Sequence, residues 1–455
     1  MIDPHYNSGP KNRPHVDFRG NSSALYWFTW GIKLLGFFRV QDKIHRMTLR
    51  IFFLTIFLFV PIKAAEWPEF RGPNAQGVVE AKAVPSKMGN ENLVWKTMVP
   101  GAGWSSPVMS CGLIVVTTAV KTRKIELRVI ALDAETGQIV WNQKLFEPSE
   151  QEAGSIHAKN SLASSSPLIS GGIIYAHFGH MGTAALSLKD GKVKWRYHDT
   201  YPAMHGNGGS PVLVEDVLIF SADGEKEGLL RGLNAVTGKL KWEVNRKQDV
   251  RRKFSFGTPL IVESGGEKVV VSQGSGMVGG YRPRDGKLIW WVNYGEGFSL
   301  VPRPVHQDGR VYLATGFMKA KLLAIRLEGA KGEITDTHVE WEATRDIPTT
   351  PSFVISGDEI FITDDTGRLS CLSRKTGERL WRDSYKRKIS ASLTLVGSRL
   401  FAFSEEGQGF VHEVSDEGAE AIAVNEFAEP VFASPIIFDG SVIVRSKSNL
   451  WRFGN

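Results

Sequence analysis

A short hairpin that ends on a tryptophan recurs along this chain. In its clearest copy, residues 131–141, an apolar strand leads through Asp133, Thr136 and Gly137 into a second strand that ends at Trp141. These are typical turn residues, and glycine adopts positive φ without steric cost. Similar segments end 40 to 54 residues apart at Trp195, Trp242, Trp290, Trp341 and Trp381. Repeats of this length, each with about four short strands, are typical of a β-propeller.

A second marker opens the units. A small residue followed by proline occurs at Ser106-Pro107, Ser166-Pro167, Ser210-Pro211, Thr258-Pro259, Thr350-Pro351 and Ser434-Pro435, with Arg303-Pro304 and Ser392-Leu393 as departures. Proline is tolerated at the first residue of a strand. Small residues suit the innermost strand, because blades crowd together near the axis. The eight openings predict an all-β propeller of eight blades, each with four antiparallel strands.

The ends of the chain predict how the ring closes. The last unit, which begins at Ser434, contains only residues 441–445 and 449–453 as further strands, so it is one strand short. Residues 93–96 form an early strand that has no blade of its own. We expect this strand to complete the eighth blade, which would leave no open gap in the ring. We expect a structural role between neighbouring blades for the recurring tryptophans, namely Trp95, Trp141, Trp195, Trp242, Trp290, Trp341 and Trp381.

The N-terminal region resembles an export signal. Residues 51–60 are almost wholly apolar, follow Arg50 and precede small residues, which is the pattern of a signal peptide that starts at Met47. We therefore divide the chain into a doubtful extension (1–46), a signal peptide (47–65), a leader segment (66–92) and the propeller (93–455). Export would place the propeller in the periplasm or outside the cell. The alternative keeps residues 1–46, and membrane association would follow only if the apolar segment is uncleaved.

Charge and cysteine content exclude several classes of protein. The net charge is +7, but residues 1–65 contain nine of the 55 Lys and Arg and only three of the 48 Asp and Glu. The remainder is therefore nearly neutral, which does not favour nucleic-acid binding. The two cysteines, Cys111 and Cys371, lie in separate repeats and match no zinc or haem spacing.

The repeat at 131–141 closely resembles that of the pyrroloquinoline-quinone-like propeller family, and the resemblance covers residues 93–453. This family includes quinoprotein alcohol dehydrogenases and the propeller lipoprotein of the outer-membrane assembly machinery. The dehydrogenases commonly hold their quinone beneath a vicinal disulfide, whereas Cys111 and Cys371 are far apart in this sequence. They also use an acidic calcium site, for which Asp223, Asp364 and Asp365 are the nearest candidates here. The lipoprotein is anchored through an N-terminal cysteine, and none closely follows the apolar run. The resemblance thus implies the fold more strongly than a function.

One face of the predicted ring collects polar side chains. Loops that enter a first strand and loops that join the second and third strands lie on this face, around the mouth of the axial channel. The candidate ligand-binding residues there are His157, Lys159, Asn160, His177, His180, His205, Asn207, Lys253 and Arg303. Three interpretations remain open. The side chains could simply satisfy the loops, they could bind an anion or a carbohydrate, or His177, His180 and His205 could bind a metal.

These features predict an exported, non-catalytic scaffold. Its channel mouth would bind a small anionic or saccharide ligand, or a protein partner, and we expect no cofactor and no catalytic residues. The alternative is a quinoprotein-type oxidoreductase that uses pyrroloquinoline quinone and a divalent cation, such as calcium, at the same mouth.

Overall fold

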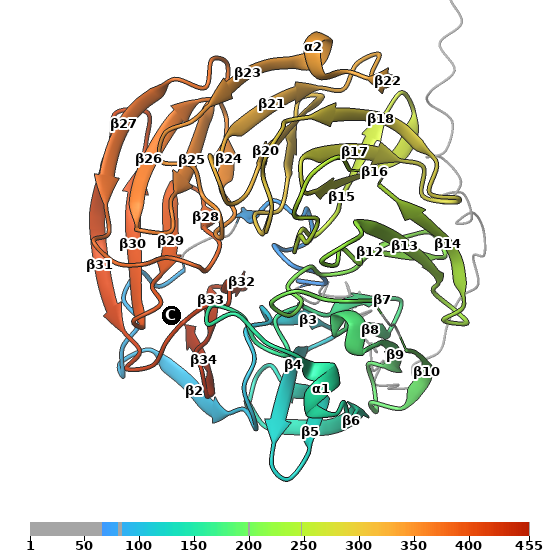
Figure 1. The fold of residues 1–455 in the computed structure, drawn as a ribbon. Helices are drawn as coiled ribbons and strands as arrows, with labels where there is room; N and C mark the ends of the chain where they lie inside the picture. The colour runs from blue at the N-terminus through green and yellow to red at the C-terminus, as the bar shows by residue number, and fades with distance from the viewer. Residues whose placement is uncertain (1–65, 81–83, 199–200, 247, 455) are drawn as a thin grey trace, which may run out of the picture. The chain divides into compact units, whose positions relative to one another are not determined.

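Eight β-sheets stand around a central axis, as predicted (Figure 1). The computed structural model describes residues 66–80, 84–198, 201–246 and 248–454. The predicted extension and signal peptide lie outside these residues. Within the described part of the chain, no helix is both long and apolar enough to cross a membrane.

The first four blades follow one another along the chain. Blade 1 contains β3 (Val108–Ser110), β4 (Leu113–Lys121), β5 (Ile125–Asp133) and β6 (Ile139–Phe146). Blade 2 contains β7 (Leu168–Ser170), β8 (Ile173–His177), β9 (Thr183–Ser187) and β10 (Val193–Tyr197). Blade 3 contains β11 (Val212–Val214), β12 (Val217–Ser221), β13 (Leu229–Asn234) and β14 (Leu240–Asn245). Blade 4 contains β15 (Leu260–Ser264), β16 (Glu267–Gly274), β17 (Met277–Tyr281) and β18 (Leu288–Asn293).

The remaining blades complete the ring. Blade 5 contains β19 (Val305–Gln307), β20 (Arg310–Ala314), β21 (Leu322–Arg326) and β23 (Val339–Ala343). Blade 6 contains β24 (Val354–Ser356), β25 (Glu359–Thr363), β26 (Arg368–Ser373) and β27 (Arg379–Ser384). Blade 7 contains β28 (Thr394–Val396), β29 (Arg399–Phe403), β30 (Gln408–Val414) and β31 (Ala419–Glu426). Blade 8 contains β32 (Ile436–Phe438), β33 (Ser441–Arg445), β34 (Asn449–Gly454) and β2 (Leu93–Met98).

The predicted closure is confirmed. Strand β2 pairs antiparallel with β34, with Lys96 opposite Trp451, so the two ends of the propeller share one blade. Two blades have a short fifth strand that the sequence did not predict. Strand β1 (Val78–Val79) pairs parallel with β28 at the axis, and β22 (Gly332–Glu333) pairs parallel with the outer strand β18. Helix α2 (Thr335–His338) follows β22, so this insertion covers part of the blade 4 edge.

The repeated hairpin is stabilised by the tryptophan of the preceding blade. Asp133 accepts hydrogen bonds from the hydroxyl and the backbone N–H of Thr136, both at 2.8 Å. Gly137 has a φ of 70°, and a Cβ there would lie 2.5 Å from the Trp95 ring. The Trp95 indole donates to the Ala134 carbonyl at 3.0 Å. The equivalent indoles donate in the same way into the next blade from Trp141, Trp195, Trp242, Trp341 and Trp381.

Trp290 departs from this pattern. Its ring is 1% exposed, but its indole nitrogen has no hydrogen-bond partner among the described residues. The blade that follows Trp290 contains the β22–α2 insertion in place of the regular turn. The missing hydrogen bond therefore coincides with the insertion between β21 and β23 of blade 5.

A ring of hydrogen bonds joins the blades at the axis. In most blades, the backbone N–H two residues before the first strand donates to a hydroxyl at the same position of the next blade, at 2.9 to 3.1 Å. We call these positions the axial ring; they are Ser106, Ser166, Ser210, Thr258, Arg303, Ser352, Ser392 and Ser434. Seven of the eight links are present, because Arg303 has no hydroxyl to accept from Thr258.

The axial ring corrects one predicted opening. The sequence placed the start of blade 6 at Thr350-Pro351, but Ser352 occupies the ring position and β24 begins at Val354. Phe353 stands where most other units have proline, so the proline marker pointed two residues too early.

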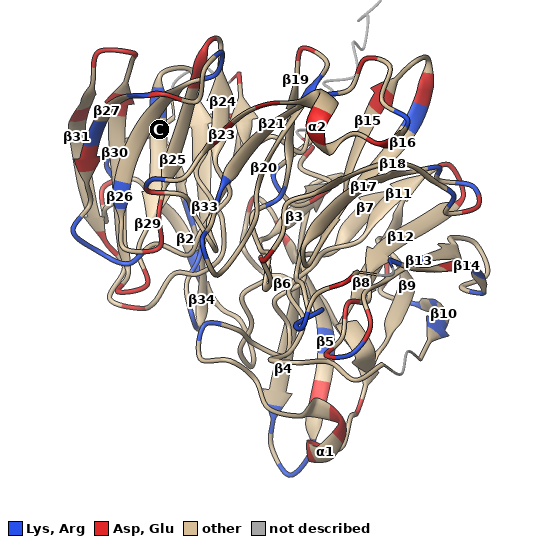
Figure 2. Ribbon diagram, turned by 45° about the horizontal axis from the view of Figure 1, so that its top comes forward, with Lys and Arg blue, Asp and Glu red and all other residues tan. Residues whose placement is uncertain are grey.

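Charged residues lie mainly away from the axis of the ring (Figure 2). The first strands β3, β7 and β11 contain no charged residue, and charged residues gather at turns and on outer strands such as β31. The polar surface of the channel must therefore come from its loops and from the axial ring.

We expect Ser392→Ala to lower the free energy of unfolding by about 1–3 kcal/mol, because the buried N–H of Ser352 loses its acceptor. Ser170→Ala, at an exposed strand end, is the control and should change stability by less than about 0.5 kcal/mol. Urea denaturation of both variants measures the difference. Equal effects would show that the ring does not stabilise the fold.

Candidate binding site at the mouth of the channel

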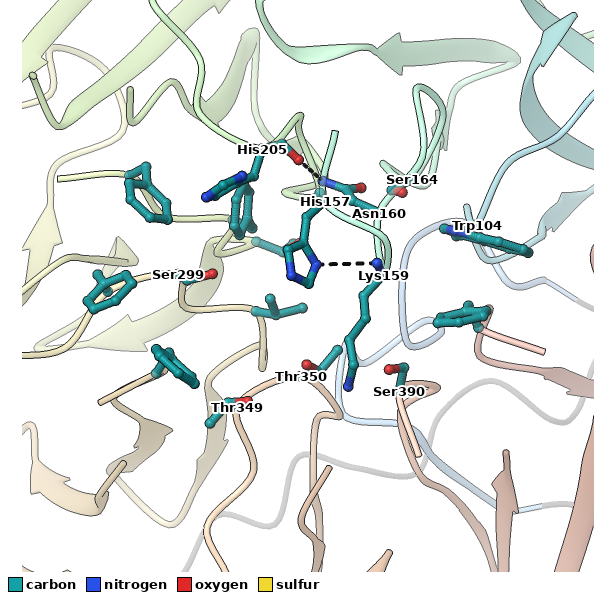
Figure 3. Close-up of a pocket in the computed structure, with 18 of the residues that line it drawn as sticks. Trp104, His157, Lys159, Asn160, Ser164, His205, Ser299, Thr349, Thr350 and Ser390 are labelled. Atoms are coloured by element: carbon teal, nitrogen blue, oxygen red, sulfur yellow. Dashed lines mark hydrogen bonds between the residues drawn. The ribbon is translucent and has the colours of Figure 1, made fainter. Parts of the chain in front are cut away.

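A cavity of about 850 Å³ lies at the mouth of the axial channel. Its floor is formed by axial-ring residues, namely Ser106, Ser166, Ser210, Thr258, Ser392 and Ser434. Its wall is formed by loops that enter the first strands and by loops between second and third strands, so it lies on the predicted face. Figure 3 shows the side chains around it. The volume lies within the range of roughly 300–1,000 Å³ that is common for ligand-binding pockets.

A second ring of residues lies above the floor. It consists of the residues two positions before each axial-ring residue, all of which line the cavity: Trp104, Ser164, Gly208, Phe256, Val301, Thr350, Ser390 and Phe432. We call these eight residues the upper ring. Trp104 stacks on Phe432 from the neighbouring blade with 4.5 Å between ring centroids. Blades 1, 4 and 8 contribute large side chains to the upper ring, whereas blades 2, 3 and 7 contribute serine or glycine, so the cavity is asymmetric.

Four of the nine predicted residues line this cavity: His157, Lys159, Asn160 and His205. The backbone N–H of His157 donates to the His205 carbonyl at 3.3 Å, and the Asn160 amide donates to the same carbonyl at 2.9 Å. The two imidazoles meet edge to face, 5.7 Å apart. His205 has a φ of 65°, a left-handed conformation that is uncommon outside glycine. The entry loops of blades 2 and 3 therefore hold each other at the mouth.

Lys159 crosses the mouth from blade 2. Its ammonium lies 2.9 Å from Glu405 in blade 7 and 3.5 Å from Asp365 in blade 6, on the far side of the ring. Figure 3 shows the side chain running from His157 towards Thr350 and Ser390. Burial alone would lower the pKa of Lys159, but the hydrogen bond to Glu405 and the charge of Asp365 raise the pKa above its ordinary value. The lysine therefore remains charged and its charge is balanced within the wall.

The other five predicted residues lie outside the cavity lining. His177 is fully buried at the end of β8, where its ring lies 4.2 Å from Phe220 and its Nδ1 is 2.8 Å from the Thr183 hydroxyl. His180 Nε2 lies 2.5 Å from the Glu152 carbonyl, beside the short helix α1 (Glu150–Ala153). Asn207 is buried, and its amide donates to Gly209 at 3.4 Å. Lys253 lies beside the lining residues Arg252 and Phe254 without joining them.

The Arg303 side chain contacts the leader segment, on the side of the channel away from the mouth. Its buried guanidinium pairs with Glu69 at 2.7 Å and donates to the Phe70 carbonyl at 2.5 Å. Arg71 in turn donates to the Phe353 carbonyl at 2.5 Å, and burial together with the charge of Arg303 lowers the pKa of Arg71 to about 9. The leader thus crosses the axis on the side away from the mouth, and Phe70 forms part of the cavity floor.

The geometry does not bring the three candidate metal ligands together. His177 lies in the core, His180 binds the α1 backbone and His205 lies at the mouth. Over the described ranges, no group of three or more His, Cys, Asp or Glu could hold a metal. Of the two carboxylates in the cavity lining, Asp365 already accepts from Thr349 and pairs with Lys159, which leaves Glu225. This donor set does not fit a quinone with a divalent cation, and Cys111 and Cys371 are both free thiols.

Several residues of the wall are not among the nine predicted from the sequence. Arg251 and Arg252 line the cavity, whereas the prediction had chosen their neighbour Lys253. Phe298 and Phe432 were also missed. A usable signal was present for Phe432, because every position two residues before the axial ring contributes to the wall.

The buried histidine gives a pH prediction. The pKa of the His177 imidazole is lowered to about 3, chiefly by burial, with the positive charges of Arg231 and His180 adding to the effect. The unfolded chain, with a histidine pKa near 6.5, therefore binds more protons than the folded one between about pH 3 and 6.5. The stabilising contribution is present above pH 6.5 and is lost as the pH falls through this window.

Between pH 7 and pH 5, the wild-type protein should lose about 2 kcal/mol more unfolding free energy than His177→Leu does. Thr183→Val is the matched control, because it removes the hydrogen bond but keeps the titrating ring, and it should retain the wild-type pH dependence. Urea denaturation at the two pH values tests this. A His177→Leu variant with the wild-type pH dependence would contradict it.

A family model and the sequences of known proteins both match this chain. A family model described as outer membrane protein assembly factor BamB matches residues 81–226, 203–383 and 365–454. The chain is 24% identical over 341 residues to BamB of Yersinia pestis, covering 70% of this chain and 78% of that protein.

Two solved structures share the fold. BamB from Moraxella catarrhalis has a TM-score of 0.58 at 13% identity and covers 80% of this chain and 97% of that one. A europium-containing methanol dehydrogenase has a TM-score of 0.67 at 11% identity, and the match covers 86% of this chain and 98% of that one. The family match extends over nearly the whole propeller, in agreement with the predicted pyrroloquinoline-quinone-like repeat. The chain therefore belongs to the outer membrane protein assembly factor BamB family.

Proposed function

We propose that this chain is an exported, non-catalytic scaffold that binds a protein partner through the mouth of its channel. The proposal rests on the exposed residues at the edge of the mouth, which we call the rim. Two apolar side chains stand exposed there, Phe317 at 53% and Met318 at 45%. Arg251 and Arg252 lie on the adjacent blade. Aromatic residues, methionine and arginine are the types enriched at protein interfaces.

Family membership supports the same function. The name of the related proteins describes a factor that assembles outer-membrane proteins, and such a role requires contacts with other proteins. Export fits this proposal, since residues 51–60 resemble the apolar core of a signal peptide. Nothing in the wall favours the oxidoreductase alternative, because the available carboxylates do not fit a bound cation.

The backbone of the rim loop between β20 and β21 keeps its apolar side chains exposed. Phe317 joins Phe298 in an isolated β-bridge, and their rings lie 5.6 Å apart. The next two residues, Met318 and Lys319, both have positive φ values, of 71° and 56°. Such conformations cost free energy outside glycine and cluster at functional sites. The loop thus holds two apolar side chains outward at the mouth.

A photo-crosslinking amino acid in place of Phe317 should capture one defined cell-envelope protein in the cells that make this chain. The matched control is Val236, which is 76% exposed in the β13–β14 turn, on the opposite face. Phe317→Ala combined with Met318→Ala should weaken binding of the captured partner by about tenfold. Identical capture from both positions, or no capture at all, would contradict the proposal.

A further inference from the structure

The hydroxyl groups of the axial ring can each still donate one hydrogen bond. Each accepts a backbone N–H from the neighbouring blade, as at Ser106, Ser166 and Ser434. A hydroxyl that accepts in this way still has a proton to donate. Within the described ranges, none of the six floor hydroxyls donates to a protein acceptor at hydrogen-bond distance. The floor therefore presents a circle of O–H donors to whatever occupies the cavity.

The rim adds positive charge on one side. Arg251 and Arg252 are both exposed and line the cavity from the entry loop of blade 4. Neither forms an ion pair with any residue that the structure describes. The Arg252 guanidinium lies 4.6 Å from the centre of the Phe298 ring, which orients it. The other lining cation, Lys159, is balanced by Asp365 and Glu405. Among the described residues, Asp365 and Glu225 are the carboxylates that line the cavity.

Aromatic side chains form two opposite parts of the wall. Trp104 and Phe432 stack on one side. On the other side, Phe254 contacts His205 and Phe298 with centroid separations of 5.4 and 5.3 Å. A ligand for this cavity therefore needs aromatic or apolar groups that reach the walls, together with oxygen acceptors for the arginines and the hydroxyl floor.

We infer that the cavity binds a short extended peptide segment in which carboxylate side chains stand beside aromatic ones. This inference rests on the proposed protein-binding function and names the part of the partner that enters the mouth. Carboxylate oxygens can accept from both guanidinium and hydroxyl groups. An extended segment matches an enclosed cavity better than a folded surface does. Alternating side chains of such a segment point to opposite sides, so acidic and aromatic groups can face different parts of the wall.

Titration calorimetry with a blocked tetrapeptide that alternates aspartate and phenylalanine tests the inference. Two further peptides separate the contributions: one replaces aspartate by asparagine, and the other replaces phenylalanine by serine. The first peptide should bind at least about tenfold more tightly than either of the others, since one lost charge or aromatic contact changes affinity by about this factor. Its affinity should also fall as salt is added, because the arginines are exposed.

Arg251→Gln combined with Arg252→Gln should weaken binding of the acidic peptide by about tenfold or more and leave binding of the asparagine peptide unchanged. The matched control is Arg284→Gln with Lys287→Gln. These exposed residues belong to the β17–β18 turn of the same blade, on the opposite face, and their loss should have no effect. Thermal unfolding of both double variants confirms that they are folded.

Three results would overturn the inference. These are equal affinity for the three peptides, no loss of affinity in the Arg251/Arg252 variant, and binding of free phenylacetate as tight as that of the acidic peptide. The last result would make the cavity a small-molecule site. Crosslinking of a partner from Phe317 tests the protein-binding function separately, so the inference can fail while that function stands.

Discussion

The hydrogen bonds of the axial ring are the interaction on which the other features depend. Each N–H that donates to a hydroxyl of the next blade places neighbouring first strands at the same height. The position must be small, because eight strands converge there, and it must accept a hydrogen bond, because the N–H is buried. Serine and threonine satisfy both requirements. The same choice makes the floor of the cavity polar, so a packing constraint determines part of its chemistry.

The single departure from the ring is where the leader binds. Arg303 cannot accept from Thr258, and its guanidinium instead donates to the Pro259 carbonyl at 3.1 Å and reaches Glu69 and Phe70. A buried arginine needs several acceptors, and the leader supplies two of them. The residue that interrupts the ring therefore also holds the segment that crosses the channel, and Phe70 of that segment lines the cavity.

Repetition made the fold predictable, and the loss of repetition limited the prediction of the site. Trp95 and Ser434 revealed the ring closure because each is half of a pattern that recurs elsewhere. His177 was misplaced for a physical reason: β8 extends to it, and both faces of that strand are buried, so no alternation showed that the side chain points into the core. Arg303 resembled a mouth residue because it follows an entry loop. Nothing local indicated that its partners, Glu69 and Phe70, come from a segment more than 230 residues earlier.

The two charged features of the mouth have different physical roles. Lys159 joins opposite blades, and its charge is compensated by Asp365 and Glu405, so it organises the mouth without attracting an anion strongly. Arg251 and Arg252 form no ion pair with the residues that the structure describes, and they lie beside the aromatic loops of blades 4 and 5. Attraction for an incoming chain is therefore concentrated off the axis, near Phe298 and Phe317. The upper ring contributes only Ser164 and Gly208 on blades 2 and 3, so a segment that enters beside the arginines and reaches these blades meets the floor hydroxyls beside small residues.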